Sequence, residues 1–206
     1  MDFAKLYAEQ FYMIDTIPNI TRSNKILIPM HKAIANFIEE NSNFKAVSLP
    51  DKEFEAVFPY GTKKIDIALL DDKNNLKGAI LFKGIRSEYN KNANNYYESM
   101  KGESSLFIDN NIPVYQIIFI PTKVRHKLSN GKQGFEDPTT KSFNNYNTFI
   151  NNRPNYWDSL KLGVFYFDIN YDEYTAEYSK NKVIDNMENN LSEGLLNFIK
   201  KVTDNG

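Results

Sequence analysis

The sequence predicts one α/β domain with a mixed central β-sheet flanked by helices. Three observations predict this class: helical spacing of apolar residues at several places, alternating or densely apolar stretches between them, and a composition that supports a core. Of 206 residues, 41% are hydrophobic, 14% aromatic and 25% charged, as in ordinary soluble domains. We therefore interpret residues 1–206 as one domain with its core at about 29–120.

The N-terminal part of the chain has the spacing of helices. Apolar residues that begin at Phe3 predict a helix over residues 2–14. Pro29 suits the first turn of a helix, and the apolar spacing after it predicts a second helix to about Asn41.

The pattern then changes to the alternation that is typical of half-buried strands. Turn signals separate three such segments, which predict strands over 53–58, 64–70 and 76–83. Short connections favour an antiparallel meander. Alternation in the second strand places Ile65 and Ile67 on one face and Asp66 on the other.

The second half of the chain mixes helices and strands. Helical spacing predicts a helix over 93–107, and a densely apolar run predicts a buried central strand over 114–120. The polar residues 121–145 predict a long loop, which in a compact domain is often functional. A strand over 162–169 and an amphipathic helix over 183–202 complete the expected fold.

Composition excludes several classes of site. Without cysteine there can be no disulfide, zinc–thiolate site, Fe–S cluster or cysteine nucleophile, and two histidines (His31 and His126) argue against a multi-histidine metal site. The start at Met1 has no secretory pattern, and no apolar run approaches the roughly 20 residues that span a bilayer. We expect a cytoplasmic protein without membrane contact.

Charge is unevenly distributed along the chain. The net charge of −1 excludes binding to nucleic acid over the whole surface. Residues 83–145 nevertheless carry nine basic and six acidic side chains, a net +3, whereas residues 146–206 carry six basic and nine acidic, a net −3. A local basic cleft for nucleic acid is therefore compatible with the total.

A carboxylate and a lysine are predicted to meet on two neighbouring strands. The turn at 71–75 brings Asp66 and Lys83 to one face of the sheet. A carboxylate in such a pair can hold a divalent metal ion, and the lysine can stabilise charge that develops at a phosphate.

These residues resemble a known family. The segment Lys63–Ala68, a hairpin and then Gly78–Lys83 resembles the core of the PD-(D/E)XK nucleases, and residues 85–103 resemble the segment after the motif lysine in some type II restriction endonucleases. The resemblance covers roughly residues 53–120 and implies a restriction-endonuclease-like core.

By this resemblance Asp66 is the metal-binding carboxylate and Lys83 is the motif lysine. The chain departs from the pattern at Leu81, where the family has Glu or Asp. Some branches supply that carboxylate from the following helix, where Glu98 and Glu103 lie five positions, or about 140°, apart. Both are catalytic candidates, and the spacing of Glu98 from the lysine favours it as the metal ligand.

Further candidates extend the site. Glu55, on the preceding strand, and Glu39 or Glu40, on the second helix, could add an outer metal ligand. Polar residues after the lysine form a first group of DNA-binding candidates: Ser87, Asn90, Lys91, Asn92 and Asn94. The basic part of the predicted loop supplies a second group: Lys123, Arg125, Lys127, Asn130 and Lys132.

This interpretation leads to two candidate functions. The first is a Mg²⁺-dependent endonuclease that cuts double-stranded DNA at a specific site, as type II restriction enzymes do. Cutting both strands of a palindrome favours a homodimer, and a restriction enzyme would need a partner methyltransferase. The second, suggested by Leu81, is an inactive nuclease fold that binds DNA or protein.

Overall fold

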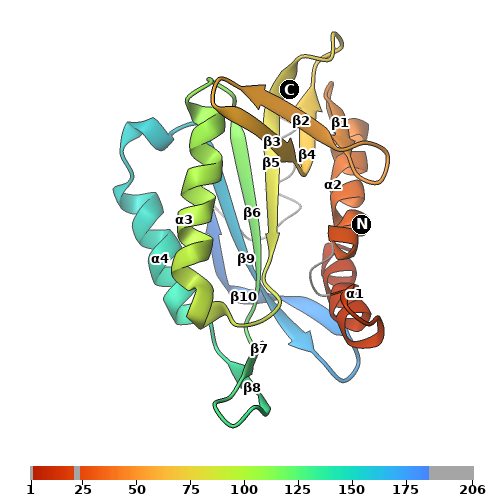
Figure 1. Cartoon of the computed structure of the whole chain (residues 1–206), viewed down its shortest axis with the longest axis vertical. Coiled ribbons are helices and arrows are strands. Elements are labelled where there is room, and N and C mark those ends of the chain that lie inside the picture. Colours follow the sequence, from red (N-terminus) through yellow and green to blue (C-terminus); the bar gives the residue numbers. More distant parts are fainter. Residues whose placement is uncertain (1, 21–23, 186–206) are drawn as a thin grey trace.

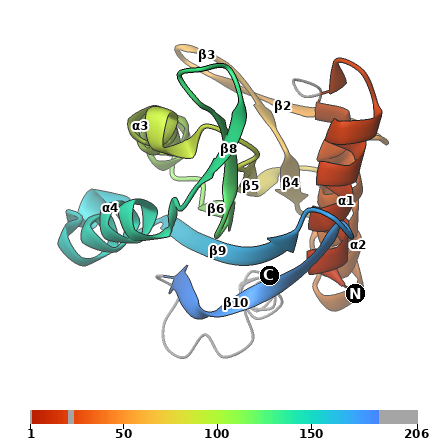
Figure 2. The same ribbon diagram turned by 90° about the horizontal axis from the view of Figure 1, so that it is seen from below.

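A curled, mixed six-stranded sheet forms the centre of the protein. The computed structural model describes residues 2–20 and 24–185. The strands lie side by side in the order β1 (Lys45–Ser48), β4 (Ile67–Leu70), β5 (Leu76–Gly84), β6 (Val114–Pro121), β9 (Leu160–Asn170) and β10 (Thr175–Asp185). β5, β6 and β9 are parallel, and the outer pairs are antiparallel (Figures 1 and 2).

Helices cover both faces of this sheet, which confirms the predicted mixed α/β class. One face packs on α1 (Phe3–Thr16) and α2 (Ile28–Asn41), and the other packs on α3 (Tyr89–Ile108) and α4 (Thr139–Asn152) (Figure 1). Two apolar cores result, one on each face. Every residue of β6 is buried, as its dense apolar sequence predicts.

The N-terminal helices form as the sequence predicts. The side chain of Asp2 caps α1 by accepting a hydrogen bond from the backbone N–H of Lys5 at 3.0 Å. α2 carries Pro29 in its first turn, where no backbone donor is lost. Short 3₁₀ turns at Asn24–Ile26 and Asn155–Trp157 complete the helical elements of the described chain.

The predicted strand over 64–70 is wrong in one respect: it is two strands that join at Asp66. β3 (Gly61–Ile65) pairs with β2 (Phe54–Phe58) in a separate hairpin, and β4 then enters the central sheet. Ile65 packs in the core under α3, whereas Ile67 packs in the core under α1 and α2. The bend therefore turns the chain so that these two side chains do not share a face.

The predicted loop over 121–145 is also wrong. β7 (Val124–Lys127) and β8 (Gln133–Glu136) form a hairpin in this stretch, and α4 begins at Thr139. The hairpin strands are mostly polar, and all their residues except Val124 are partly or fully exposed, so alternation of apolar residues does not reveal them. α4 is rich in Asn and Thr, and its buried residues are few.

The C-terminal prediction is tested only in part. β9 confirms the strand predicted over 162–169. Residues 183–185, assigned in the prediction to the start of a helix, belong to β10 instead, and residues 186–202 lie outside the described residues. None of the described helices has both the length and the apolar character needed to cross a membrane.

Candidate active-site cleft

A cleft of about 610 Å³ opens at the ends of β3 and β5. Its walls come from both hairpins, which lie at opposite ends of the sheet in Figure 1, and from α1 and α3. Eight charged residues line it: Lys63, Lys64, Lys83, Arg86, Arg125, Asp15, Asp66 and Glu103. Five of these are basic and three are acidic, so the lining carries an excess of positive charge.

Asp66 lies at the bend between β3 and β4. Its Oδ2 accepts a hydrogen bond from the backbone N–H of Phe82 at 2.8 Å, which fixes the carboxylate against β5. Removal of the carboxyl from water raises its pKa, although His31, the bond from Phe82 and Lys63 act in the opposite direction. Asp66 is thus a carboxylate held in place and destabilised in its charged form, as functional carboxylates often are.

Lys83 is the next-to-last residue of β5 and lines the same cleft as Asp66. Its side chain is exposed, and its Nζ lies 5.4 Å from the ring centroid of Tyr96 on α3. The ammonium group can therefore reach a ligand in the cleft while the aromatic ring restrains it.

Of the two helix carboxylates, the structure brings Glu103 to the cleft. Glu103 contacts the Nζ of Lys63 through Oε1 at 2.9 Å and interacts electrostatically with Asp66. Glu98 is exposed, pairs with Lys101 at 3.1 Å, and is not among the residues that line the cleft. The two carboxylates point in different directions because they lie about 140° apart around the helix.

Leu81 has a place in the apolar core. It is 2% exposed and packs in the core under α3. Its register partner on β6 is Gln116, whose Nε2 donates to Ser104 Oγ on α3 at 3.2 Å. No acidic side chain enters the cleft from position 81, and of Glu98 and Glu103 only Glu103 lines it.

The donor set in the cleft suits a magnesium ion with several water ligands. No group of three or more His, Asp or Glu side chains within the described residues could enclose a metal ion. Mg²⁺ is commonly held by one or two carboxylates together with water and substrate phosphate. Asp66 and Glu103 supply such a pair, with Lys63 as the present partner of Glu103.

The other proposed metal ligands lie elsewhere. Glu55 on β2 is exposed and accepts a hydrogen bond from Thr62 Oγ1 at 3.0 Å. Glu39 on α2 accepts from the backbone N–H of Ala46 at 3.0 Å and thereby ties α2 to β1, and Glu40 is exposed. None of the three lines the cleft.

The raised pKa of Asp66 gives a stability prediction. Because the folded state retains the proton to higher pH than the unfolded chain, the stability of the wild type falls as pH rises from the ordinary pKa of 3.8 through the raised value. Asp66→Asn removes this dependence. We expect the variant to unfold at a higher temperature than wild type at pH 7 without metal, with a difference that shrinks toward pH 4. Thermal unfolding of both proteins between pH 4 and pH 7 tests this prediction. A difference in unfolding temperature that does not change with pH would contradict it.

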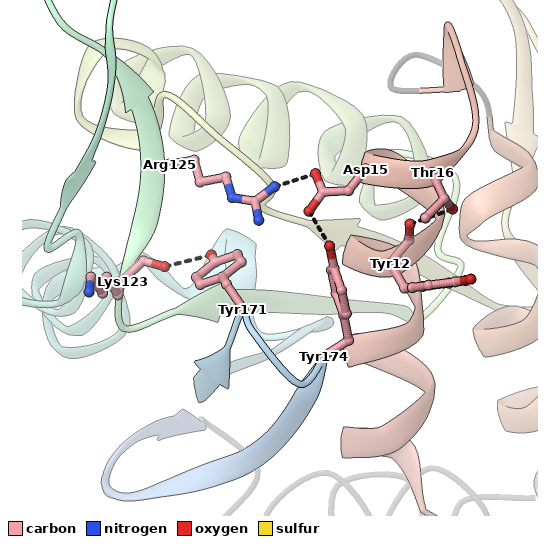
Figure 3. Close-up of polar contacts among 7 residues, drawn as sticks. All are labelled: Tyr12, Asp15, Thr16, Lys123, Arg125, Tyr171 and Tyr174. Carbon is pink, nitrogen blue, oxygen red and sulfur yellow. Dashed lines mark hydrogen bonds and ion pairs between the residues drawn. The ribbon is translucent and has the colours of Figure 1, made fainter.

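Arg125 takes part in a network at the β7 end of the cleft (Figure 3). Its guanidinium pairs with the Asp15 carboxylate of α1 and lies 4.5 Å from the ring centroid of Tyr171. Tyr174 donates to the other Asp15 oxygen at 2.9 Å. Burial alone would raise the pKa of Asp15, but the hydrogen bonds from Arg125 and Tyr174 outweigh it and lower the pKa.

This network ties α1, β7 and the β9–β10 turn together. Tyr171 also donates to the backbone oxygen of Lys123 at 2.7 Å (Figure 3), and the Nζ of Lys123 lies 4.4 Å from the ring centroid of Phe135. Arg125 and Lys123, both expected to contact DNA, thus have intramolecular partners. Arg125 still lines the cleft, whereas Lys123 does not.

The remaining predicted DNA-binding residues divide by position. Lys127, Asn130 and Lys132 lie on the β7–β8 hairpin and are exposed, and the side chain of Asn130 accepts from the backbone N–H of Lys132 at 3.0 Å. The backbone N–H of Lys127 donates to Glu88 Oε1, which anchors the hairpin beside the start of α3.

The group after Lys83 lies mainly on the first turns of α3. Ser87 lines the cleft. The backbone N–H of Asn90 donates to Glu136 Oε1 at 3.0 Å, and the side chain of Asn92 donates to the backbone oxygen of Glu88, just before the helix, at 2.9 Å. Lys91 and Asn94 are exposed.

Three basic residues of the cleft are absent from the candidates that the sequence suggests. Lys63 and Lys64 reach the cleft because β3 runs directly into Asp66, and Arg86 reaches it because it comes shortly after β5. The signal that could have found them is proximity along the chain to Asp66 and Lys83, since a basic side chain within three residues of a motif residue lies near the same strand end.

Comparisons of the chain with family models, with curated proteins and with solved structures find no match. The structure by itself defines a curled mixed α/β fold with a basic cleft that Asp66 and Glu103 line.

Proposed function

We propose that this protein hydrolyses phosphodiester bonds of double-stranded DNA with Mg²⁺, as a restriction-endonuclease-like enzyme. The observation that carries the proposal is the convergence of Asp66, Lys83 and Glu103 on one cleft that is lined by further cations. These three residues come from a strand bend, a strand end and a helix. Their chemical types are those that metal-assisted phosphate hydrolysis requires.

The fold supports this proposal because Asp66 lies just before β4 and Lys83 lies on the adjacent strand β5. β4 and β5 pair antiparallel with Ile67 opposite Ile80, so Asp66 lies next to the C-terminal part of β5, which contains Lys83. Helices on both faces hold these strands, as a restriction-endonuclease-like core requires.

Each residue has a distinct role in the proposed reaction. Bound Mg²⁺ would supply a water of lowered pKa and stabilise negative charge on the phosphate. Asp66, fixed by Phe82, and Glu103 would hold the ion. Lys83 stabilises the negative charge that develops at the phosphate and orients the attacking water.

Digestion of a supercoiled plasmid tests the proposal. With Mg²⁺ we expect discrete linear fragments whose mapped ends define a recognition site, and no cleavage in EDTA. Tight binding to DNA without cleavage in any divalent metal ion would instead support a binding module, the alternative that the buried Leu81 favours.

Three further parts of the proposal concern the cellular setting. A palindromic site would be cut by two copies of the chain, so we propose a homodimer, which light scattering of the DNA complex would measure. A restriction enzyme acts with a methyltransferase that protects the host DNA, and both would work in the cytoplasm.

A further inference from the structure

The basic residues that line the cleft differ in whether they already have an acidic partner. Lys63 pairs with Glu103 at 2.9 Å, Lys64 pairs with Glu53, and Arg125 pairs with Asp15. Lys83 and Arg86 form no ion pair with any carboxylate of the described chain.

Arg86 differs from Lys83 in its surroundings. Lys83 is exposed, so water can solvate its charge. The side chain of Arg86 is partly buried, and its Nη1 is fully buried without a hydrogen-bond partner among the described residues. The pKa of Arg86 is lowered by burial, with opposing effects of Tyr96 and Tyr7. An arginine remains charged even so.

A partly buried guanidinium whose Nη1 is buried without a partner is costly for the fold. A charge removed from water is normally compensated by an opposite charge and by hydrogen bonds. The described chain supplies neither to Nη1 of Arg86. Because the side chain is only partly buried and lines an open cleft, a ligand there can supply an opposite charge to the accessible part of the guanidinium.

We infer that Arg86 binds a backbone phosphate of the nucleic acid beside the one that is cleaved. A guanidinium can hold two phosphate oxygens at once through parallel N–H groups. Arg86 lies three residues after Lys83 and lines the same cleft, so a strand whose scissile phosphate lies at Asp66 and Lys83 would present a neighbouring phosphate to it. This inference rests on the proposed function.

Binding measurements without divalent metal test Arg86 separately from cleavage. We compare wild type with Arg86→Gln and Arg86→Lys, using fluorescence anisotropy of a labelled duplex over a range of salt. Arg86→Gln should weaken binding about tenfold and reduce the magnitude of the salt slope by about 0.9, the value for one phosphate contact. Arg86→Lys keeps the charge without the fork, so it should retain the slope and lose part of the affinity.

Lys73→Gln is the matched control. It removes one positive charge in the turn before β5, at the end of the strand opposite Lys83, and should leave affinity and slope at wild-type values. Arg86→Gln should not lower the unfolding temperature, since no ion pair is lost. Unchanged affinity and salt slope in Arg86→Gln would overturn the inference. If the unfolding temperature of that variant were also lower, the role of Arg86 would be to stabilise the fold.

Two further results separate the possible failures. If the duplex depends on Arg86 for binding but is never hydrolysed with Mg²⁺, the nuclease proposal fails and the phosphate contact stands. If Arg86→Gln binds and hydrolyses DNA as the wild type does, the phosphate contact of Arg86 fails and the nuclease proposal stands. Millimolar inorganic phosphate could raise the unfolding temperature of the wild type but not of Arg86→Gln, while both bind DNA equally. That result would identify a site for a free anion and overturn the inference.

Discussion

Asp66→Asn is expected to reduce Mg²⁺-dependent cleavage by at least about 10³-fold, which is at the upper end of the loss for removal of one electrostatic group from an active site. The amide keeps the size of the carboxyl group but loses the negative charge that would hold the ion. The rate of plasmid conversion under single-turnover conditions measures the effect. DNA affinity without metal should stay equal or increase, because one negative charge leaves the cleft.

Asp72→Asn provides the control for this experiment. Asp72 is an exposed carboxylate in the turn between β4 and β5, so its substitution changes the net charge equally without touching the cleft. It should cleave at the wild-type rate. If Asp66→Asn cleaves as fast as this control, hydrolysis takes place without Asp66 and the proposed site is wrong.

The elements that sequence predicts well are those in which burial has a simple period. β6 is a densely apolar run that is buried on both faces, and α1 and α2 bury one stripe each. β1 escapes prediction because four residues are too few for alternation to be distinguished from chance. α4 is not predicted because the residues that it buries include polar ones, so it lacks a clear apolar stripe. One of them is Ser142, whose Oγ lies 2.9 Å from the Tyr166 hydroxyl oxygen.

The bend at Asp66 shows where strict alternation fails. A regular strand would place Ile65 and Ile67 on one face, whereas the structure packs them in two different cores. The side chain of Asp66 accepts a hydrogen bond from the Phe82 backbone, a contact between residues 16 positions apart. Local sequence patterns cannot reveal that contact, although the hairpin between Asp66 and Lys83 allows their presence in one cleft to be predicted.

The choice between Glu98 and Glu103 cannot be made from spacing alone. The phase of a helix relative to a cleft depends on how its apolar side packs, and α3 buries Ala93, Met100 and Phe107 toward the sheet. Glu103 lies three residues after Met100, on the neighbouring part of the surface, and so reaches the cleft. Glu98 lies where it pairs with Lys101 in solvent.

The orientation of α3, which turns Glu103 but not Glu98 to the cleft, leads to the second prediction with a large expected effect. Glu103→Gln should reduce the Mg²⁺-dependent rate by about 10²-fold or more and raise the Mg²⁺ concentration needed for half-maximal rate, because one of the two carboxylates is lost. Glu98→Gln, which removes the same charge from the same helix, should remain within about twofold of wild type, since its exposed ion pair contributes little to stability. Titration of cleavage with Mg²⁺ measures both quantities.

The pair of variants also distinguishes two explanations for a loss of activity. Glu103 contacts Lys63, so its substitution could act by releasing that lysine into the cleft. Lys63→Gln alone tests this: if Glu103 is a metal ligand, the lysine variant retains cleavage and needs no more Mg²⁺ than wild type, because it removes a competitor for the same carboxylate. Full activity in Glu103→Gln with loss in Glu98→Gln would show that the functional carboxylate is Glu98, on the other side of α3.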